Sequence, residues 1–234
     1  MDSGKAVWEV PEVAPTVMTV RGSAESVEAR LRAGVLRCPC CGGRLVRWGW
    51  ALPRVVVMLA GEREFRPRRS RCSGCGRTHV LLPADLWSRR RYGAVVIMLV
   101  LVLAVRAAAA GRVPARPWVT VSGGVRRLVP ASTARSWRSR FAARAGVLRQ
   151  GLTRVLALAD PSARAFVPAG SPSGDCLAVL EAVTAGLRRR FAVLAAVTAH
   201  EVAAHLSGGG WLAPAVPVPG FNTSLLTAVT VPPR

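Results

Sequence analysis

Two Cys-x-x-Cys pairs, Cys38/Cys41 and Cys72/Cys75, lie about thirty residues apart in the first third of the chain. Two residues between cysteines let one tight turn direct both sulfur atoms at a single ion, and two such turns complete a tetrahedral site. A glycine follows the second cysteine of each pair and permits the positive φ that closes the turn. We therefore predict a structural Zn²⁺ ion held by Cys38, Cys41, Cys72 and Cys75. Because protein ligands fill all four positions, we expect no catalytic role for the metal.

The remaining cysteines and the nearby histidine are expected to lie outside the metal's ligand set. Six cysteines in a chain without a recognisable secretory signal favour metal binding or burial, and disulfide pairing is the alternative. Cys40 lies inside the first turn and is expected to be a bystander, although it could replace Cys41 in a distorted site. The spacing of His79 favours a position at the rim of the site over a ligand. The helical pattern around Cys176 places it in a core.

The distribution of apolar residues, glycine and proline predicts an α+β protein. A small β zinc ribbon is followed by a mainly α helix-turn-helix and a helical C-terminal region. The expected boundaries are 1–35 for an N-terminal extension with a short strand and helix, 36–84 for the zinc ribbon, 85–146 for the helix-turn-helix, 147–208 for the helical C-terminal region and 209–234 for a flexible tail.

Individual elements follow from alternation, helical spacing and capping residues. Ser23 is expected to cap a helix from about Ala24 to Ala33, with Val27 and Leu31 facing inward. Short strands are expected at 16–20, 44–50 and 54–59, and helical patterns at 93–105, 132–145, 147–159 and about 175–206.

The formal charge of +21 and the pI near 11.8 constrain the partners of the chain. Arginine supplies nearly all of this charge, because Lys5 is the only lysine. The planar guanidinium suits phosphates and guanine edges. A field of this sign attracts nucleic acid first and anionic membranes second. A genome rich in G and C would also raise the arginine content, but it would not explain the clustering.

Two segments are expected to contact DNA. In the ribbon, arginines crowd the approach to the second cysteine pair, where a solvated face is the alternative. Farther on, Ser132 is predicted to cap a recognition helix whose Ala134, Trp137 and Phe141 face inward. An ordinary amphipathic helix is the alternative there. Because glycine disfavours helices, the helix before it is expected to be short, from Val125 to Leu128. The predicted DNA-contacting residues are Arg66, Arg68, Arg69 and Arg71 in the ribbon, and Ser132, Thr133, Arg135, Ser136, Arg138 and Arg140 on the helix.

Three motifs together resemble the front end of insertion-sequence transposases: a CPxCGG knuckle, the run RRxRCxxCGRTHVLLP and the segment PASTxRxW. They are similar to an uncharacterised bacterial family of stand-alone proteins with a zinc ribbon and a helix-turn-helix. The resemblance covers roughly residues 14–146. It implies DNA binding, with the four cysteines as zinc ligands and with Ser132, Thr133 and Arg135 on the recognition helix. The Gly123-Gly124 pair and the long 111–124 linker depart from that pattern.

We expect no enzymatic activity. A transposase needs three carboxylates on a ribonuclease-H-like sheet to hold two metal ions. His200 and His205 are five residues apart, which rotates them by about 140° around a helix, so the metalloprotease spacing is not met. The acidic residues that follow the predicted helix-turn-helix are only Asp160, Asp175, Glu181 and Glu201.

The uncharged run from Gly93 to Val105 admits a second interpretation of the chain. It is shorter than the roughly 20 residues of a membrane span, so a buried helix is favoured and a buried strand is permitted. A membrane-anchored zinc-ribbon protein with one span near 93–110 remains the alternative. A protein-interaction module without nucleic acid is a third hypothesis.

We therefore expect a zinc-containing DNA-binding protein that is transposase-like but lacks a catalytic domain. Its expected role is that of a transcriptional regulator or a mobile-element accessory. The expected location is cytoplasmic, in association with the nucleoid. The expected partners are DNA and a second copy bound through the C-terminal helices.

Overall fold

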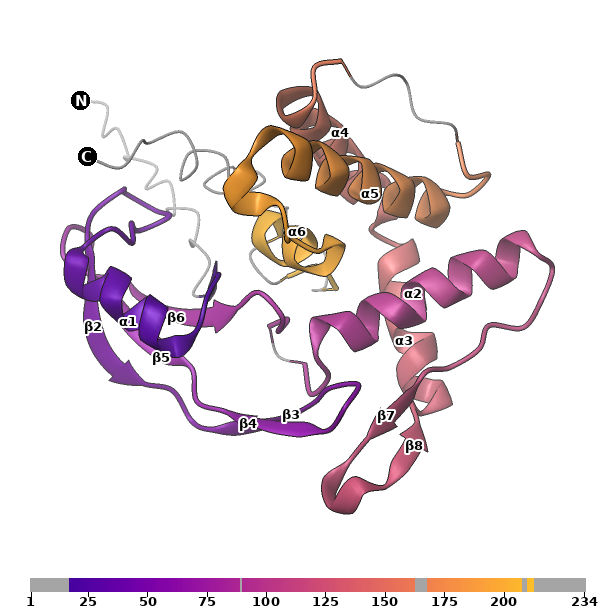
Figure 1. Cartoon of the computed structure of the whole chain (residues 1–234), viewed down its shortest axis with the longest axis horizontal. Helices are drawn as coiled ribbons and strands as arrows, with labels where there is room; N and C mark the ends of the chain where they lie inside the picture. Colours follow the sequence, from indigo (N-terminus) through magenta and orange to yellow (C-terminus); the bar gives the residue numbers. More distant parts are fainter. Residues whose placement is uncertain (1–16, 89, 163–167, 208–209, 213–234) are drawn as a thin grey trace, which may run out of the picture.

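The computed structural model describes residues 17–88, 90–162, 168–207 and 210–212. They form a small sheet with one covering helix, two β-hairpins and a helical region (Figure 1). The predicted α+β class is confirmed. Residues 1–16 of the expected N-terminal extension and, apart from 210–212, the expected tail lie outside the described residues.

The N-terminal elements fold as the sequence predicts. Strand β1 (Val17–Val20) leads into helix α1 (Ala24–Ala33). The Ser23 side chain accepts a hydrogen bond from the Ser26 backbone N–H, which satisfies one of the open donors of the first turn. Strand β1 pairs in parallel with strand β6 of the ribbon, so this segment is an integral part of the ribbon sheet.

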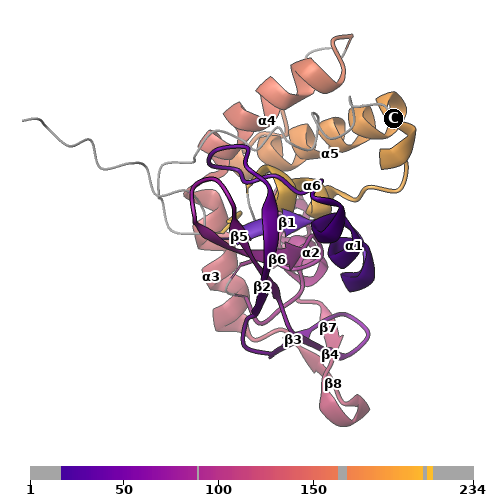
Figure 2. The same cartoon turned by 90° about the vertical axis from the view of Figure 1, so that its left-hand side faces the viewer.

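The ribbon consists of one four-stranded sheet in the order β1-β6-β5-β2 and a separate hairpin, β3–β4. Helix α1 covers one face of the sheet (Figure 2), where Leu31, Leu45 and Leu81 form a small core. The hairpin packs on the other face near its β6 end, through Val56 and Leu82. The ribbon strands are β2 (Leu45–Trp50), β3 (Arg54–Val57), β4 (Glu62–Phe65), β5 (Arg68–Cys72) and β6 (Thr78–Pro83).

The helical region contains the largest core of the described residues. The chain returns to the ribbon at α6, where the Thr19 hydroxyl donates a buried hydrogen bond of 3.1 Å to the Ala204 carbonyl. The elements of this region are α2 (Ala94–Ala109), β7 (Trp118–Thr120), β8 (Arg126–Leu128), α3 (Ala131–Ala142), α4 (Ala145–Ala159), α5 (Pro172–Arg190) and α6 (Ala199–Leu206).

Helix α2 buries its first half in this core. Val96, Ile97, Val100 and Leu101 on it are each at most 2% exposed. Its 16 residues extend about 24 Å at 1.5 Å per residue, less than the roughly 30 Å of a bilayer's hydrocarbon core. None of the described helices is long and apolar enough to cross a membrane. The predicted core helix is confirmed, and the alternative of a span near 93–110 is not supported.

The predicted helix-turn-helix is not found. In that motif a turn of about three or four residues joins the two helices, whereas residues 110–130 separate α2 from α3 and form the β7–β8 hairpin. The short helix expected from Val125 to Leu128 was wrong, because those residues enter β8. Gly123 and Gly124 adopt φ of +76° and +75° and form the hairpin turn.

Helix α3 has the predicted inward stripe but a different start. Ala134, Trp137 and Phe141 are buried as predicted. The helix begins at Ala131, and no side chain caps it, so the expected cap at Ser132 was wrong. Pro130 precedes the first turn with an extended backbone, which moves the helix start one residue ahead of the serine.

The C-terminal pattern expected at 175–206 is divided into two helices. Helix α5 ends at Arg190, and α6 begins after Thr198, which forms a reciprocal capping box with Glu201. Helices α4 and α5 pack closely against each other within one chain (Figure 1). The buried position expected for Cys176 on α5 is confirmed. Pairing of two copies through these helices stays a prediction.

Candidate metal centre and basic surfaces

The four predicted ligands lie together at one end of the ribbon. The Sγ atoms of Cys38 and Cys75 are 3.7 Å apart, those of Cys41 and Cys72 are 3.4 Å apart, and all four lie within 4.8 Å of one another. A tetrahedron of thiolates about 2.3 Å from zinc has sulfur atoms roughly 3.8 Å apart. The four side chains therefore fit one zinc ion, and they could bind it without rearrangement of the backbone.

The backbone of each turn explains why two separate segments meet in this geometry. In the first turn, the Cys38 N–H donates to the Gly43 carbonyl and the Gly42 N–H donates to the Cys38 carbonyl. In the second turn, Cys72 and Gly76 repeat both bonds, with Arg77 in the place of Gly43. Gly42 and Gly76 adopt φ of +70° and +71°, so the predicted role of the glycines is confirmed.

Close approach of the two turns requires a further glycine. A Cβ atom at Gly43 would lie 2.9 Å from the Cys72 sulfur and 3.2 Å from the Cys41 sulfur. Both distances are shorter than ordinary contacts, so a side chain there would displace the sulfur atoms. Gly43 thus belongs to the metal site although it provides no ligand. The sequence does not indicate this role, because it depends on how closely the second cysteine turn approaches the first.

The local environment shifts the pKa values of two of the thiols in opposite directions. The backbone N–H of Cys75, with other donors, lowers the pKa of the Cys72 thiol to about 6. Burial raises the pKa of the Cys38 thiol to about 11. A bound metal ion deprotonates a coordinating thiol outright, so loading of the site releases the Cys38 proton and weakens as the pH falls.

His79 lies in the interior instead of at the rim where the sequence places it. It is 1% exposed, and its Nε2 is 3.3 Å from the Cys38 sulfur. Its ring nitrogen lies within 4.8 Å of the Cys38 and Cys40 sulfur atoms and outside the four-cysteine group, so it contacts that group through Cys38. A zinc-bound cysteine carries no proton, so in the loaded site the histidine N–H donates to sulfur.

We expect replacement of His79 by leucine to weaken zinc binding by about 10- to 100-fold, the usual effect of losing an outer hydrogen bond to a ligand. Leucine fills the buried space but cannot donate to the Cys38 sulfur. The measurement is competition for zinc with a chromophoric chelator, with Thr78→Val on the same strand as the control. Equal zinc affinity in the wild type and His79→Leu would show that this bond does not support the site.

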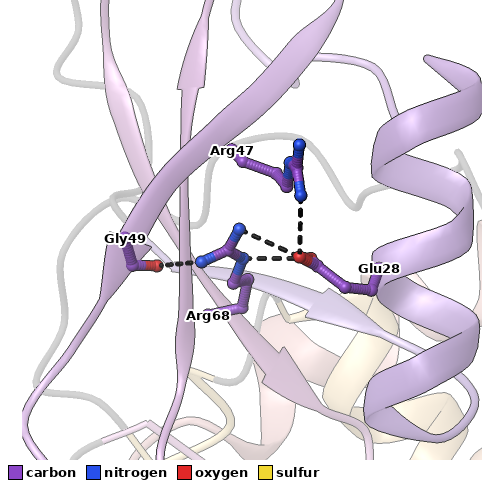
Figure 3. A network of polar contacts seen from close by, with 4 residues as sticks. All are labelled: Glu28, Arg47, Gly49 and Arg68. Carbon is purple, nitrogen blue, oxygen red and sulfur yellow. Dashed lines mark hydrogen bonds and ion pairs between the residues drawn. The ribbon is translucent and has the colours of Figure 1, made fainter.

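The predicted ribbon arginines divide into two groups. Arg68 is enclosed, because it forms a bidentate pair with Glu28 on α1, at 3.0 Å for both bonds, and donates to the Gly49 carbonyl (Figure 3). Arg47 lies 3.9 Å from the same carboxylate. The charge and the donor groups of Arg68 are therefore used by partners within the protein. Arg66 and Arg71 are exposed, and Arg69 is half-buried.

The predicted residues of α3 lie on its outer side. Ser132, Arg135, Ser136 and Arg140 are exposed, whereas Thr133 and Arg138 are half-buried. Within the described ranges, Arg135, Arg138 and Arg140 form no ion pair. Arg135 and Arg138 line a depression of about 200 Å³. Arg116, which lies just before strand β7, also lines it.

The β7–β8 hairpin lies directly beside the start of α3 (Figure 1) and continues into it. Its base is closed by the Val129 N–H, which donates to the Pro117 carbonyl, and by Arg116, which donates to the Val129 carbonyl. Arg126 stacks over the half-exposed Trp118 ring at 5.5 Å. The hairpin is therefore a basic projection closed at its base, and its second strand contains the residues Val125 to Leu128 for which a short helix is predicted.

Comparison with known proteins gives one match. No curated protein and no solved structure matches the chain, so the resemblance to transposases stays a prediction. Residues 38–113 match a family model described as a domain of unknown function (DUF6431). The matched stretch begins at the first cysteine and ends just beyond α2. Over this stretch the chain is thus similar to a family of unknown function, and the match covers the metal cluster, the ribbon strands β2 to β6 and helix α2, but not β1 or α1.

Proposed function

We propose that the chain is a zinc-containing DNA-binding protein that contacts duplex DNA through α3 and the β7–β8 hairpin. The observation that supports this most strongly is the distribution of charge. Between Asp85 and Asp160 the sequence contains fourteen arginines and no acidic residue. The larger part of the net charge of +21 is therefore concentrated in the segment that includes α2, the hairpin, α3 and α4.

The exposed side of α3 has the residue types that duplex recognition uses. Its buried stripe, with Trp137 and Phe141, anchors the helix to the core. The opposite side presents Arg135 and Arg140 between serines. Arginine contacts guanine edges in the major groove through two parallel hydrogen bonds, and serine hydroxyls contact bases or phosphates. This helix is therefore suited to lie in the major groove.

The hairpin supplies a second set of contacts beside that helix. Arg126 and Arg127 are exposed on β8, five and four residues before α3 begins at Ala131. Flanking phosphates are the natural partners of such arginines, because they fix the protein on the duplex without contributing sequence information. Arg116, which lines the same depression as Arg135 and Arg138, would add a further positive charge beside these contacts.

We infer a regulator or an accessory of a mobile element, without a catalytic centre of its own. The zinc site serves the fold in this account, because four cysteine ligands leave no position for substrate.

Arg135→Ala is expected to weaken binding to a preferred duplex by about 1–3 kcal/mol, the range for one base-contacting arginine. The preferred duplex is obtained by selection from random sequences with zinc-loaded, full-length protein. The matched control is Arg154→Ala, which removes the same charge from an exposed position on α4. Equal losses for the two variants would remove α3 from the DNA interface.

A further inference from the structure

We infer that the face of the ribbon sheet opposite α1, where the β3–β4 hairpin leaves it uncovered, is a second nucleic-acid surface, where Trp48 stacks on a base of single-stranded DNA. This surface is separate from α3 and goes beyond the proposed contact with duplex DNA. The inference rests on an exposed tryptophan that is held in place by an arginine, on the fixation of that arginine by a metal-site turn, and on the charge of the surrounding face.

Strand β2 forms the free edge of the sheet, and all its residues after Leu45 are exposed. Trp48 is 49% exposed, and the Arg71 guanidinium lies 4.7 Å from its ring centroid. Arg71 also donates from Nε to the Gly76 carbonyl at 3.2 Å. Gly76 closes the second cysteine turn, so the metal site fixes the arginine and the arginine holds the indole ring.

Trp50, two residues farther along β2, is placed differently. Its ring stacks with Arg68 at 4.6 Å. Arg68 and Arg71 are three residues apart on β5, so their side chains lie on opposite faces of the sheet. The register of β2 shifts between Arg47 and Gly49, so Trp48 and Trp50 also lie on opposite faces of the sheet. Trp50 is thus on the α1 side, where Glu28 neutralises Arg68.

The β3–β4 hairpin covers the Trp48 side of the sheet at Leu82, and the strand residues that it leaves uncovered include no acidic residue. The charged members of this uncovered part are Arg69 and Arg71, and none of its residues is buried. The six described residues that form it are Val46, Trp48, Arg69, Arg71, Thr78 and Val80.

This combination fits single-stranded DNA better than a duplex. A base can stack on a protein ring only when its own face is free, which is true of unpaired bases but not of stacked base pairs. The two guanidinium groups can then contact the adjacent phosphates. The preformed Trp48–Arg71 stack lowers the conformational entropy that binding would otherwise cost.

The test is fluorescence anisotropy of a labelled oligothymidylate of about twelve nucleotides, within the usual site size for such surfaces, with zinc-loaded full-length protein. Trp48→Ala is expected to weaken binding by roughly 5- to 100-fold, the effect of losing one base stack. Trp48→Phe is expected to retain most of the affinity because it keeps an aromatic face. Trp50→Ala is the matched control, with the same residue type, strand and similar exposure, and it should leave the affinity unchanged.

Equal effects of Trp48→Ala and Trp50→Ala would overturn the inference. Tighter Trp48-dependent binding of an oligouridylate than of the oligothymidylate would assign the surface to RNA and overturn the choice of DNA. Duplex binding, measured in parallel, should depend on Arg135 and not on Trp48. A failure of this inference is thereby distinguishable from a failure of the proposed function.

Discussion

Removal of zinc is expected to unfold the ribbon while the helical region stays folded. The sheet and α1 share a core of only eight buried residues, two of which are the ligands Cys38 and Cys72. The helical core is several times larger. Binding of a structural zinc ion provides about 10–16 kcal/mol in small zinc domains, which exceeds what so small a core can replace.

Hydrogen exchange of the full-length chain, before and after chelation, measures this effect segment by segment. Protection should disappear from β2, β5 and β6 and persist in α2, α4 and α5. Cys72→Ser is expected to reproduce the loss. Cys40→Ser, which changes an exposed cysteine outside the four-cysteine cluster, should not. A ribbon that keeps its protection without metal, or equal damage from the two serine variants, would contradict a structural zinc site.

Trp211→Ala is expected to destabilise the helical region by about 3–5 kcal/mol, the usual cost of truncating a large buried aromatic side chain. Trp211 is fully buried, and its ring centroid lies 6.2 Å from both Trp87 and Phe141. The next residue, Leu212, accepts a hydrogen bond of 2.6 Å from Arg90. This segment therefore closes the core between the entry to α2 and the buried side of α3.

Urea and thermal unfolding of the zinc-loaded chain measure this loss. A domain of this size loses about 2–4 °C of melting temperature per kcal/mol, so Trp211→Ala should melt roughly 6–20 °C lower. The control is Trp118→Ala, since that ring is 51% exposed on the hairpin. Equal melting temperatures of Trp211→Ala and Trp118→Ala would show that Trp211 is not buried in the folded protein.

Local signals in the sequence predicted the elements whose structure depends on near neighbours. Ser23 caps α1 through its own side chain, and the glycine after each cysteine pair closes its own turn. The inward stripe of α3 follows from spacing alone. The thirteen uncharged residues beginning at Gly93 correctly indicated a buried helix, because they were too few to span a bilayer.

Two missed features were visible in the sequence. The run Ser122-Gly123-Gly124 between Val121 and Val125 is a hairpin signal, and it outweighs the helical preference of the residues that follow. Thr198 followed three residues later by Glu201 is a capping box that marks a new helix. The Ser132 cap failed because Pro130 can itself precede a first helical turn, a choice that local preference does not decide.

Other features depend on partners far along the chain, and no local pattern predicts them. Three contacts join segments that are distant in the sequence. They are the parallel pairing of β1 with β6, the contact of His79 with the Cys38 sulfur and the bidentate pair of Arg68 with Glu28. The last of these matters for function. Arginines of one cluster look alike in the sequence, but Arg68 is neutralised within the fold whereas Arg71 stays exposed on the opposite face.

The most direct test of DNA recognition is a salt series with zinc-loaded, full-length protein on its selected duplex and on random duplex DNA. Binding through phosphates alone weakens steeply with salt and equally for both sequences. If α3 contacts bases, the selected duplex should stay bound at salt concentrations where random DNA has dissociated, and Arg135→Ala should remove this difference. Parallel loss of both duplexes across the whole series would show that the arginines attract polyanions without recognising sequence, and would contradict base contact by α3.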